Sequence, residues 1–470
     1  MNKYTYIFAI VLSVLLFNLL QSCSSKNEED VKIEALRDNK LVALTGYNAY
    51  SYFVYKGQPM GFEYDLVKKL AEHFNVALEV KIVNNIEKMF EMLNSADGDL
   101  IAFNLTITKD RLEKVDFTNP INTSKQVLVQ RKPEKWRKMK IHEIEKLLIR
   151  DPAELIGKTV FVRSSSAYVQ RLENLSEEIG GDINVVEAGP GVTIEDLIAQ
   201  VDSGKIDYTI SDDNIAHLNS LYYRNIDAET DISLSQRIAW AVAKNSDGFV
   251  AEVNKWLDSM KSTVDFAVIY KKYFTNRYAF KKRVTSEYFS NTGGGISKYD
   301  DLIKKYSELV GWDWRLGASL IYQESQFNPN TKSWAGAVGL MQLMPNTAAQ
   351  VGITNLKKPE QNIKGGFKYL AYLDNLWKET ITDSTERIRF VLASYNVGPG
   401  HIVDARNLAE KYERDPNIWF NNVEVYLQLK SKSKYYNDEV VKSGYASGKE
   451  TVKYVKEILD RYDQYKQLIN

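Results

Sequence analysis

The stretch SLIYQESQFNPN, residues 319–330, places an acid at the end of a run that has the spacing of a buried helix face. Glu324 follows Leu320 by four residues and Ile321 by three. Side chains at this spacing share one face of a helix, and Asp313 is suited to cap the start of that helix. A buried carboxyl group is costly unless it is paired or protonated. The pattern therefore makes Glu324 a candidate for chemistry.

The composition is that of an ordinary globular protein with several domains. Hydrophobic residues make up 44% of the 470-residue chain and charged residues 26%, and about 150 residues per domain suggests roughly three folding units. Lys and Arg together number 61, as do Asp and Glu. This balance gives no basic surplus, so we predict no nucleic-acid partner.

Two kinds of pattern divide the chain. Strand-like runs such as LVALTG (41–46) and DLIAFN (99–104) alternate with helical patterns, one of which Asp65 is expected to cap, and a second such set begins near residue 155. This alternation predicts an α/β region with a largely parallel sheet. The charged stretch 131–150 is expected to be a solvated connecting helix, and Asn-Thr-Gly-Gly-Gly (291–295) a flexible linker. The chain beyond it has only helical patterns.

The single cysteine, Cys23, follows a short apolar run near the N-terminus. Residues 6–20 would form about 22 Å of helix, too short for the ~30 Å bilayer core, which favours a secretion signal. Leu20-Gln21-Ser22-Cys23 resembles a bacterial lipobox, which implies that Cys23 carries a lipid. The alternative is an ordinary signal peptide with an accidental cysteine. We expect a cell-envelope lipoprotein, placed at the outer membrane and facing the periplasm.

The α/β region resembles the family 3 extracellular solute-binding proteins. The resemblance rests on four segments, at residues 61–76, 99–121, 156–172 and 204–218. It implies two lobes that close over a ligand about a hinge. It also implies a ligand site for an amino acid or a muropeptide, made of Thr106, Arg111, Ser165 and Asp212.

Within that site, Arg111 is expected to clamp a ligand carboxylate, because a guanidinium meets a carboxylate with two parallel hydrogen bonds. Ser165 stands in a Ser-Ser-Ser step where the family has a glycine. Two alternatives remain open at this point. Arg111 could form a surface ion pair with Asp110 or Glu113, and Asp212 could be a helix N-cap.

The helical region carries four motifs in order, Glu324-Ser325, GLMQLMP (339–345), NIKGG (362–366) and ASYNVG (393–398). Together they resemble the lysozyme-like catalytic domain of soluble-type lytic transglycosylases. The resemblance implies an all-α lysozyme-like fold with Glu324 as the catalytic acid. It also implies a set of residues that bind the sugar near Glu324, namely Ser333, Gln342, Met344, Tyr395 and Asn396.

A single acid suits the chemistry of that family. Burial raises the pKa of a carboxyl group, so it can hold a proton near neutral pH for the leaving oxygen. An ordinary glycosidase needs a second carboxylate, and these motifs contain none. The resemblance implies that Glu324 then takes a proton from the sugar 6-hydroxyl, which gives a 1,6-anhydro end. No cofactor or metal is expected, since His73, His142, His217 and His401 form no metal-binding pattern.

We therefore predict a multidomain lyase that cleaves the MurNAc-GlcNAc bond of peptidoglycan glycan strands. The expected parts are a signal peptide (1–22), a tether (23–31), a ligand module (32–275), a linker (276–297) and a catalytic domain (298–470). The ligand module would regulate or target the enzyme, and the lipid would attach it to the membrane. One alternative is a sensor or transport lipoprotein whose helical domain only binds glycan. A hydrolytic lysozyme is the other.

Overall fold

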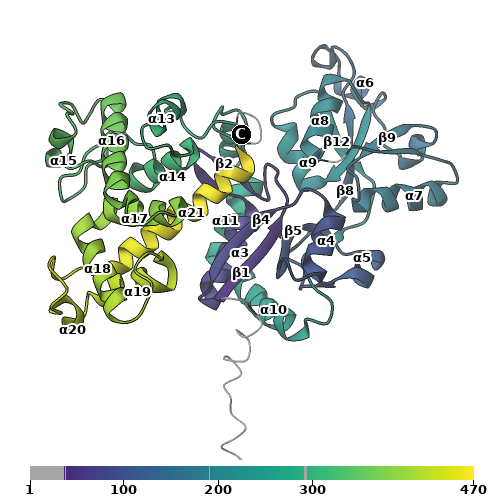
Figure 1. The fold of residues 1–470 in the computed structure, drawn as a ribbon. Coiled ribbons are helices and arrows are strands. Elements are labelled where there is room, and N and C mark those ends of the chain that lie inside the picture. Colours follow the sequence, from purple (N-terminus) through teal and green to yellow (C-terminus); the bar gives the residue numbers. More distant parts are fainter. Residues whose placement is uncertain (1–35, 37–38, 190, 291–293, 470) are drawn as a thin grey trace, which may run out of the picture. The chain divides into compact units, whose positions relative to one another are not determined.

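Two units make up the chain in the computed structural model, which describes residues 36, 39–189, 191–290 and 294–469 (Figure 1). The first unit contains the described residues up to Tyr52 and Met60–Lys282, and the second contains Phe53–Pro59 and the described residues from Arg283 on. Cys23, the expected signal peptide and the expected tether lie outside the described residues.

One sheet forms the first lobe of the α/β unit. Its strands have the order β4-β1-β5-β13-β6, and β7 also pairs with β13. β1 is parallel to β4 and β5, whereas β13 is antiparallel to β5, so the sheet is mixed rather than largely parallel. Its elements are β1 (Lys40–Thr45), α3 (Phe62–Phe74), β4 (Ala77–Ile82), α4 (Ile86–Asn94), β5 (Leu100–Thr106), α5 (Lys109–Lys114), β6 (Asp116–Phe117), β7 (Asn122–Ser124), β13 (Gln236–Val242), α10 (Asp247–Lys261) and α11 (Val264–Tyr270).

The second lobe has its own sheet, with the order β10-β9-β11-β8-β12. The chain enters this lobe between β7 and β8 and returns to the first sheet between β12 and β13, and each lobe has its own apolar core. The predicted two-lobed α/β module is thus confirmed. Its elements are β8 (Gln126–Arg131), α6 (Ile141–Glu145), β9 (Thr159–Val162), α7 (Ala167–Ile179), β10 (Asn184–Glu187), α8 (Ile194–Ser203), β11 (Tyr208–Asp212), α9 (Asp213–Ser220) and β12 (Ile226–Asp231).

The charged stretch 131–150 is not the continuous helix that its composition suggested. It contains a 3-10 turn, Trp136–Lys138, and the five-residue helix α6, with irregular chain around them. Pro133 interrupts the helical pattern, because proline clashes with the preceding turn of a helix and donates no hydrogen bond. The charged side chains are therefore carried on loops and short turns at the surface of the second lobe.

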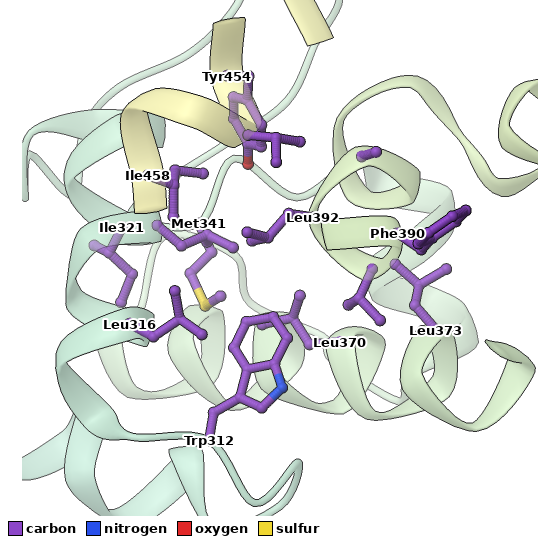
Figure 2. Close-up of a cluster of buried hydrophobic side chains, with 14 of the residues drawn as sticks. Trp312, Leu316, Ile321, Met341, Leu370, Leu373, Phe390, Leu392, Tyr454 and Ile458 are labelled. Carbon is purple, nitrogen blue, oxygen red and sulfur yellow. The ribbon is translucent and has the colours of Figure 1, made fainter. Parts of the chain in front are cut away.

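The second unit is a helical bundle around one apolar core. Figure 2 shows part of this core, where Leu316 and Ile321 lie beside Met341, Leu370 and other buried apolar side chains of the unit. The all-α prediction holds for the described residues beyond 294. The helices are α13 (Asp300–Ser307), α14 (Trp314–Ser325), α15 (Pro345–Gln350), α16 (Pro359–Lys378), α17 (Ser384–Val397), α18 (Pro399–Lys411), α19 (Glu424–Leu429), α20 (Ser433–Tyr436) and α21 (Gly448–Leu468).

A β-hairpin from early in the sequence completes the helical unit. It consists of β2 (Phe53–Tyr55) and β3 (Gln58–Met60), of which residues 53–59 belong to this unit, and it lies within the range 32–275 that was expected to be ligand module. The Val54 amide donates to Ser290 Oγ over 2.8 Å, and the Phe53 ring packs edge-on against Phe289 at 5.1 Å. The expected linker 276–297 therefore includes packed residues, and it also contains the helix α12 (Arg277–Val284).

Candidate active site

Glu324 lies in the last turn of α14, one residue before the helix ends. The predicted cap is confirmed, because the Asp313 side chain accepts a hydrogen bond from the Arg315 amide over 2.9 Å. The apolar residues that share its face are fully buried, while the Glu324 side chain is partly buried at the edge of the core. Glu324 thus lies on the inward face of the helix, as its spacing predicts, and part of its side chain is exposed to solvent.

Burial raises the pKa of the Glu324 carboxyl from its ordinary 4.5 to about 7. The Tyr454 hydroxyl donates a hydrogen bond to Glu324 Oε1, which stabilises the carboxylate and opposes the shift. A carboxyl group with this pKa holds its proton in a large fraction of molecules near neutral pH. It therefore meets the requirement for a general acid.

Tyr454 is the contact that the motifs did not predict. It comes from α21, 130 residues after Glu324 in the chain, and it lies in the same core cluster as Leu316 and Ile321 (Figure 2). Tyr454 lies in the segment GYASGKETVKYV (444–455), outside the four motifs, so their spacing gave no signal for it. The hydroxyl orients the acid and stabilises its ionised form.

We expect Tyr454→Phe to move the pH dependence of cleavage to higher pH. Loss of the hydroxyl removes a donor to the carboxylate, so the pKa of Glu324 rises further and the proton is held at higher pH. The pH profile of kcat measures this shift. A purely structural Tyr454 would change the rate equally at all pH values, and that result would contradict the assignment. Tyr462→Phe, on the same helix and bonded to Asp313 instead, is the matched control.

Tyr395 is a second tyrosine beside the acid, and burial with the nearby Glu324 charge raises the pKa of its hydroxyl. That hydroxyl donates to the Met341 carbonyl over 2.7 Å. The Tyr369 ring lies 5.6 Å from Tyr395 and stacks at 6.0 Å on Tyr372, which is largely exposed. A series of aromatic rings thus runs from Glu324 to the solvent.

The loop 339–345 is held in place by Asn362. The Asn362 Oδ1 accepts from the Met341 amide over 2.8 Å, and a Cβ on Gly339 would lie 2.3 Å from Asn362 Nδ2. Gly339 also has a φ of 84°, which favours glycine. Gln342, with a φ of 46°, donates from Nε2 to the carbonyl oxygens of Gly339 and Thr331. Ser325 Oγ also donates to the Leu340 carbonyl over 2.7 Å, so hydrogen bonds to this loop join all four sequence motifs.

The other predicted sugar-binding residues lie at the surface of this unit. Ser333 Oγ accepts from a backbone amide of its own turn over 2.9 Å, and Met344 is 42% exposed. Asn396 is exposed, and its Oδ1 accepts from Thr451 on α21 over 2.7 Å. Met341, by contrast, is a fully buried core residue. Tyr395 is the member of the predicted set that lies close enough to Glu324 for the Glu324 charge to raise its pKa.

No second carboxylate of the described residues acts on Glu324, whose pKa responds to burial and Tyr454 alone. Asp404 is fully engaged elsewhere, 2.6 Å from the buried ammonium of Lys430. Glu360 accepts from the Tyr306 hydroxyl over 2.9 Å. Among the described residues, no neighbouring carboxylate thus contributes to the raised pKa of Glu324.

A small pocket of about 30 Å³ lies between the two lobes of the α/β unit. Both lobes supply polar and aromatic side chains to it, so closure of the lobes shapes the pocket. Its wall includes Tyr50, Asn104, Thr106, Arg111, Arg163, Ser166, Tyr168 and Asp212. Three of the four predicted ligand residues, Thr106, Arg111 and Asp212, thus line one pocket. The fourth, Ser165, lies next to this pocket, because its carbonyl accepts a hydrogen bond from Arg111.

Arg111 is buried in this pocket and forms no ion pair with Asp110 or Glu113. Its guanidinium donates to the Thr106 carbonyl over 3.0 Å and to the Ser165 carbonyl over 3.2 Å. Burial lowers the pKa of Arg111 to about 10. A buried cation whose hydrogen bonds go to carbonyl oxygens is suited to receive an anion.

Asp212 is the opposite charge in the pocket. It occupies the N-cap position of α9, but its side chain makes no capping hydrogen bond. Instead its Oδ2 accepts from Asn104 Nδ2 over 2.6 Å, and burial raises its pKa to about 7. Ser165 has a φ of 56°, the left-handed backbone for which the glycine of related proteins is suited. The pocket therefore offers two cations, Arg111 and Arg163, and one acid to a small zwitterion.

Family models match both units. Residues 40–276 match the bacterial extracellular solute-binding proteins, family 3, and residues 301–419 match the transglycosylase SLT domain. Within the part of the chain that the structure describes, no helix is long and apolar enough to cross a bilayer.

Two relatives are similar along nearly their whole length. A protein of Desulfosudis oleivorans, named membrane-bound lytic murein transglycosylase F, is 39% identical over 91% of this chain and 90% of its own. One of the same name from Shewanella woodyi is 33% identical over 97% of this chain and 91% of its own. Among solved structures, an ancestral arginine-binding protein bound to arginine matches 51% of this chain and all of its own, at 22% identity and a TM-score of 0.43.

Proposed function

The chain belongs to the membrane-bound lytic murein transglycosylase F family and is a peptidoglycan lytic transglycosylase, and we propose that Glu324 is its single catalytic acid and base. The observation that carries this proposal is the raised pKa of Glu324 with no second carboxylate acting on it. Glu324 would protonate the leaving oxygen of the MurNAc-GlcNAc bond. The resulting carboxylate would then take the proton of the 6-hydroxyl, which closes a 1,6-anhydro ring without water.

The contacts of Glu324 support both halves of this reaction. Before the first step the acid is protonated, which burial favours. After it the acid is a carboxylate, which the Tyr454 hydroxyl stabilises. Tyr395, anchored on the Met341 carbonyl, would orient the sugar N-acetyl group or the acid. Ser333, Gln342, Met344 and Asn396 would contact the glycan.

The products of digested murein sacculi test the reaction. A mass spectrum with 1,6-anhydro ends supports the proposal. Reducing ends would instead indicate a hydrolytic lysozyme, and uncleaved murein would indicate that the helical unit only binds glycan.

The α/β unit would bind an amino acid or a muropeptide between its lobes. Arg111 would receive a carboxylate of the ligand, because it is the buried cation of the pocket, and Asp212, the acid of the pocket, would receive its amine. Thr106 and Ser165 would contribute through their carbonyls, which hold Arg111 in position. Ligand binding between the lobes would favour their closed arrangement.

We expect Arg111→Ala to weaken muropeptide binding at least tenfold, about 1.4 kcal/mol, because the ligand carboxylate loses its charged partner. Calorimetry with purified muropeptides on both proteins measures the change. Arg237→Ala, which removes an exposed guanidinium of the same unit, is the control for overall charge. Equal affinities of the wild type and Arg111→Ala would refute the proposed site.

The hairpin 53–59 supports a regulatory role for the ligand module. Its first residue follows the pocket residue Tyr50 by three positions in the chain. At its tip, the Gly57 carbonyl accepts from Tyr465 on α21, and a Cβ on Gly57 would lie 2.6 Å from the Phe327 ring. The hairpin thus touches the helix that carries Tyr454 and the turn that follows Glu324.

Regulation through this hairpin would require the ligand to favour one arrangement of the module over another. Murein cleavage with and without muropeptide, in the wild type and in Arg111→Ala, tests the coupling. If the ligand binds and the wild-type rate does not change, the module only targets the enzyme, and the regulatory proposal fails.

Envelope association follows from the family, and we place the enzyme at the outer membrane as a lipoprotein anchored through Cys23. The proposed organisation keeps the signal peptide (1–22), tether (23–31), ligand module (32–275), linker (276–297) and catalytic domain (298–470), with the hairpin as an insert. Metabolic labelling with palmitate tests the anchor. Label that persists in Cys23→Ser would refute it.

A further inference from the structure

A basic segment at the surface of the second lobe, residues 131–146, takes part in neither site. It carries seven Lys and Arg against three Glu, a net charge of +4 in a chain whose net charge is zero. The cations are Arg131, Lys132, Lys135, Arg137, Lys138, Lys140 and Lys146. Such a cluster of positive charge is unfavourable in the folded protein unless a partner offsets it, because like charges repel one another.

The basic segment forms one wall of a pocket of about 440 Å³, which Asn225 completes. Trp136 stands in it, and its Nε1 donates to Asn225 Oδ1 over 3.3 Å. Lys132 Nζ lies 4.6 Å from the centre of the Trp136 ring and Arg137 Cζ 4.7 Å from it. The indole therefore holds two cations near one another.

No carboxylate of the described chain neutralises these cations. None of the seven forms an ion pair with another described residue, although the segment contains three glutamates. Glu145 instead pairs with Arg150, at 2.6 Å, and Glu143 accepts from the Lys140 backbone amide. The positive charges are thus exposed together, and an anion between them would relieve their repulsion.

Two apolar side chains stand exposed in or next to the same segment. Ile141 is 77% exposed and Leu147 is 64% exposed. A small soluble anion would gain no binding energy from these two apolar side chains. Cations beside exposed apolar and aromatic side chains are typical of surfaces that lie on an anionic bilayer, where phosphates meet the cations and the apolar groups reach the acyl chains.

We propose that the basic segment docks on the anionic phospholipid surface of an envelope membrane. The family is associated with the envelope, and attraction between the exposed cations and anionic lipids would hold the α/β unit at the bilayer. The proposal does not depend on the lipidation of Cys23, because the contact is made by side chains of the folded unit.

Vesicle sedimentation tests the proposal on the full chain with Cys23→Ser, which removes the lipid. We expect more than tenfold stronger binding to phosphatidylglycerol vesicles than to phosphatidylcholine vesicles, and loss of this difference in 0.5 M salt. Combining Lys135→Glu, Arg137→Glu and Lys138→Glu should lower binding at least tenfold. Ile141→Ser with Leu147→Ser should lower it without a change of charge.

The matched control is Lys68→Glu, Lys88→Glu and Lys255→Glu, three exposed lysines of the same unit that make the same change of charge. This control should retain binding within twofold, and both triple variants should cleave murein as the wild type does. Equal losses in the two triple variants would refute the proposal, since net charge alone would then explain binding. Saturable calorimetric binding of glycerol phosphate, lost only in the first triple variant, would refute it in favour of a soluble anion.

Discussion

Glu324→Gln is expected to lower murein cleavage by more than about 10⁴-fold while the protein remains folded. General acid or base help contributes typically ~10²–10⁴, and here one residue serves both steps. The amide keeps the shape of the side chain and its neighbour Tyr454, but it can neither deliver nor accept the proton. Single-turnover digestion of sacculi measures the loss. Glu360→Gln, an exposed acid bonded to Tyr306, is the matched control and should leave the rate unchanged.

The same substitution has a stability effect whose sign follows from the pKa. Burial raises the pKa of Glu324 to about 7 in the folded protein, so from about pH 4.5 to 7 the folded state binds more protons than the unfolded state. Stability therefore falls as pH rises through this window. The Glu324→Gln variant has no titrating group at this position and therefore does not lose this stability. The free energy of unfolding of the variant minus that of the wild type should be larger at pH 8 than at pH 5. Turnover within tenfold of the wild type would show that another acid is catalytic.

Asp404→Asn is expected to destabilise the helical unit by about 3–5 kcal/mol, because it leaves a buried cation without its counter-charge. The Lys430 side chain is fully buried, and its ammonium lies 2.6 Å from Asp404 Oδ2. His401 Nδ1, at 3.1 Å, is its other polar neighbour of the described residues. Burial lowers the pKa of Lys430. The free energy of unfolding from urea titration measures the loss.

A double variant separates the charge from the packing. Asp404→Asn with Lys430→Met removes both charges and should recover part of the stability, since no unpaired charge remains buried. Asp463→Asn, which breaks the exposed pair with Lys466, should cost less than about 1 kcal/mol. A loss below that value for Asp404→Asn would contradict the assigned role of the pair.

Local sequence was enough for the features that depend on neighbours within one helical turn. The spacing of Leu320, Ile321 and Glu324 predicted the inward-facing acid, and Asp313 was correctly predicted to cap α14. Asp65 was wrongly predicted to be a cap. Gly61 holds that position, and Asp65 instead accepts from Lys272 and Tyr273, more than 200 residues away. A side chain that can cap a helix is equally suited to a distant ion pair, and only the fold decides between them.

The sequence by itself therefore determined the family, the two kinds of fold and the inward position of Glu324, because motif order and helical periodicity are properties of adjacent residues. Tertiary structure alone decided what surrounds the acid. Tyr454 reaches Glu324 across 130 residues, and the hairpin 53–59 joins a unit that begins again 230 residues later. Burial, which raises the pKa of Glu324, is also collective, since it depends on the packing of several helices. Such contacts have no period in the sequence, and so no local pattern predicts them.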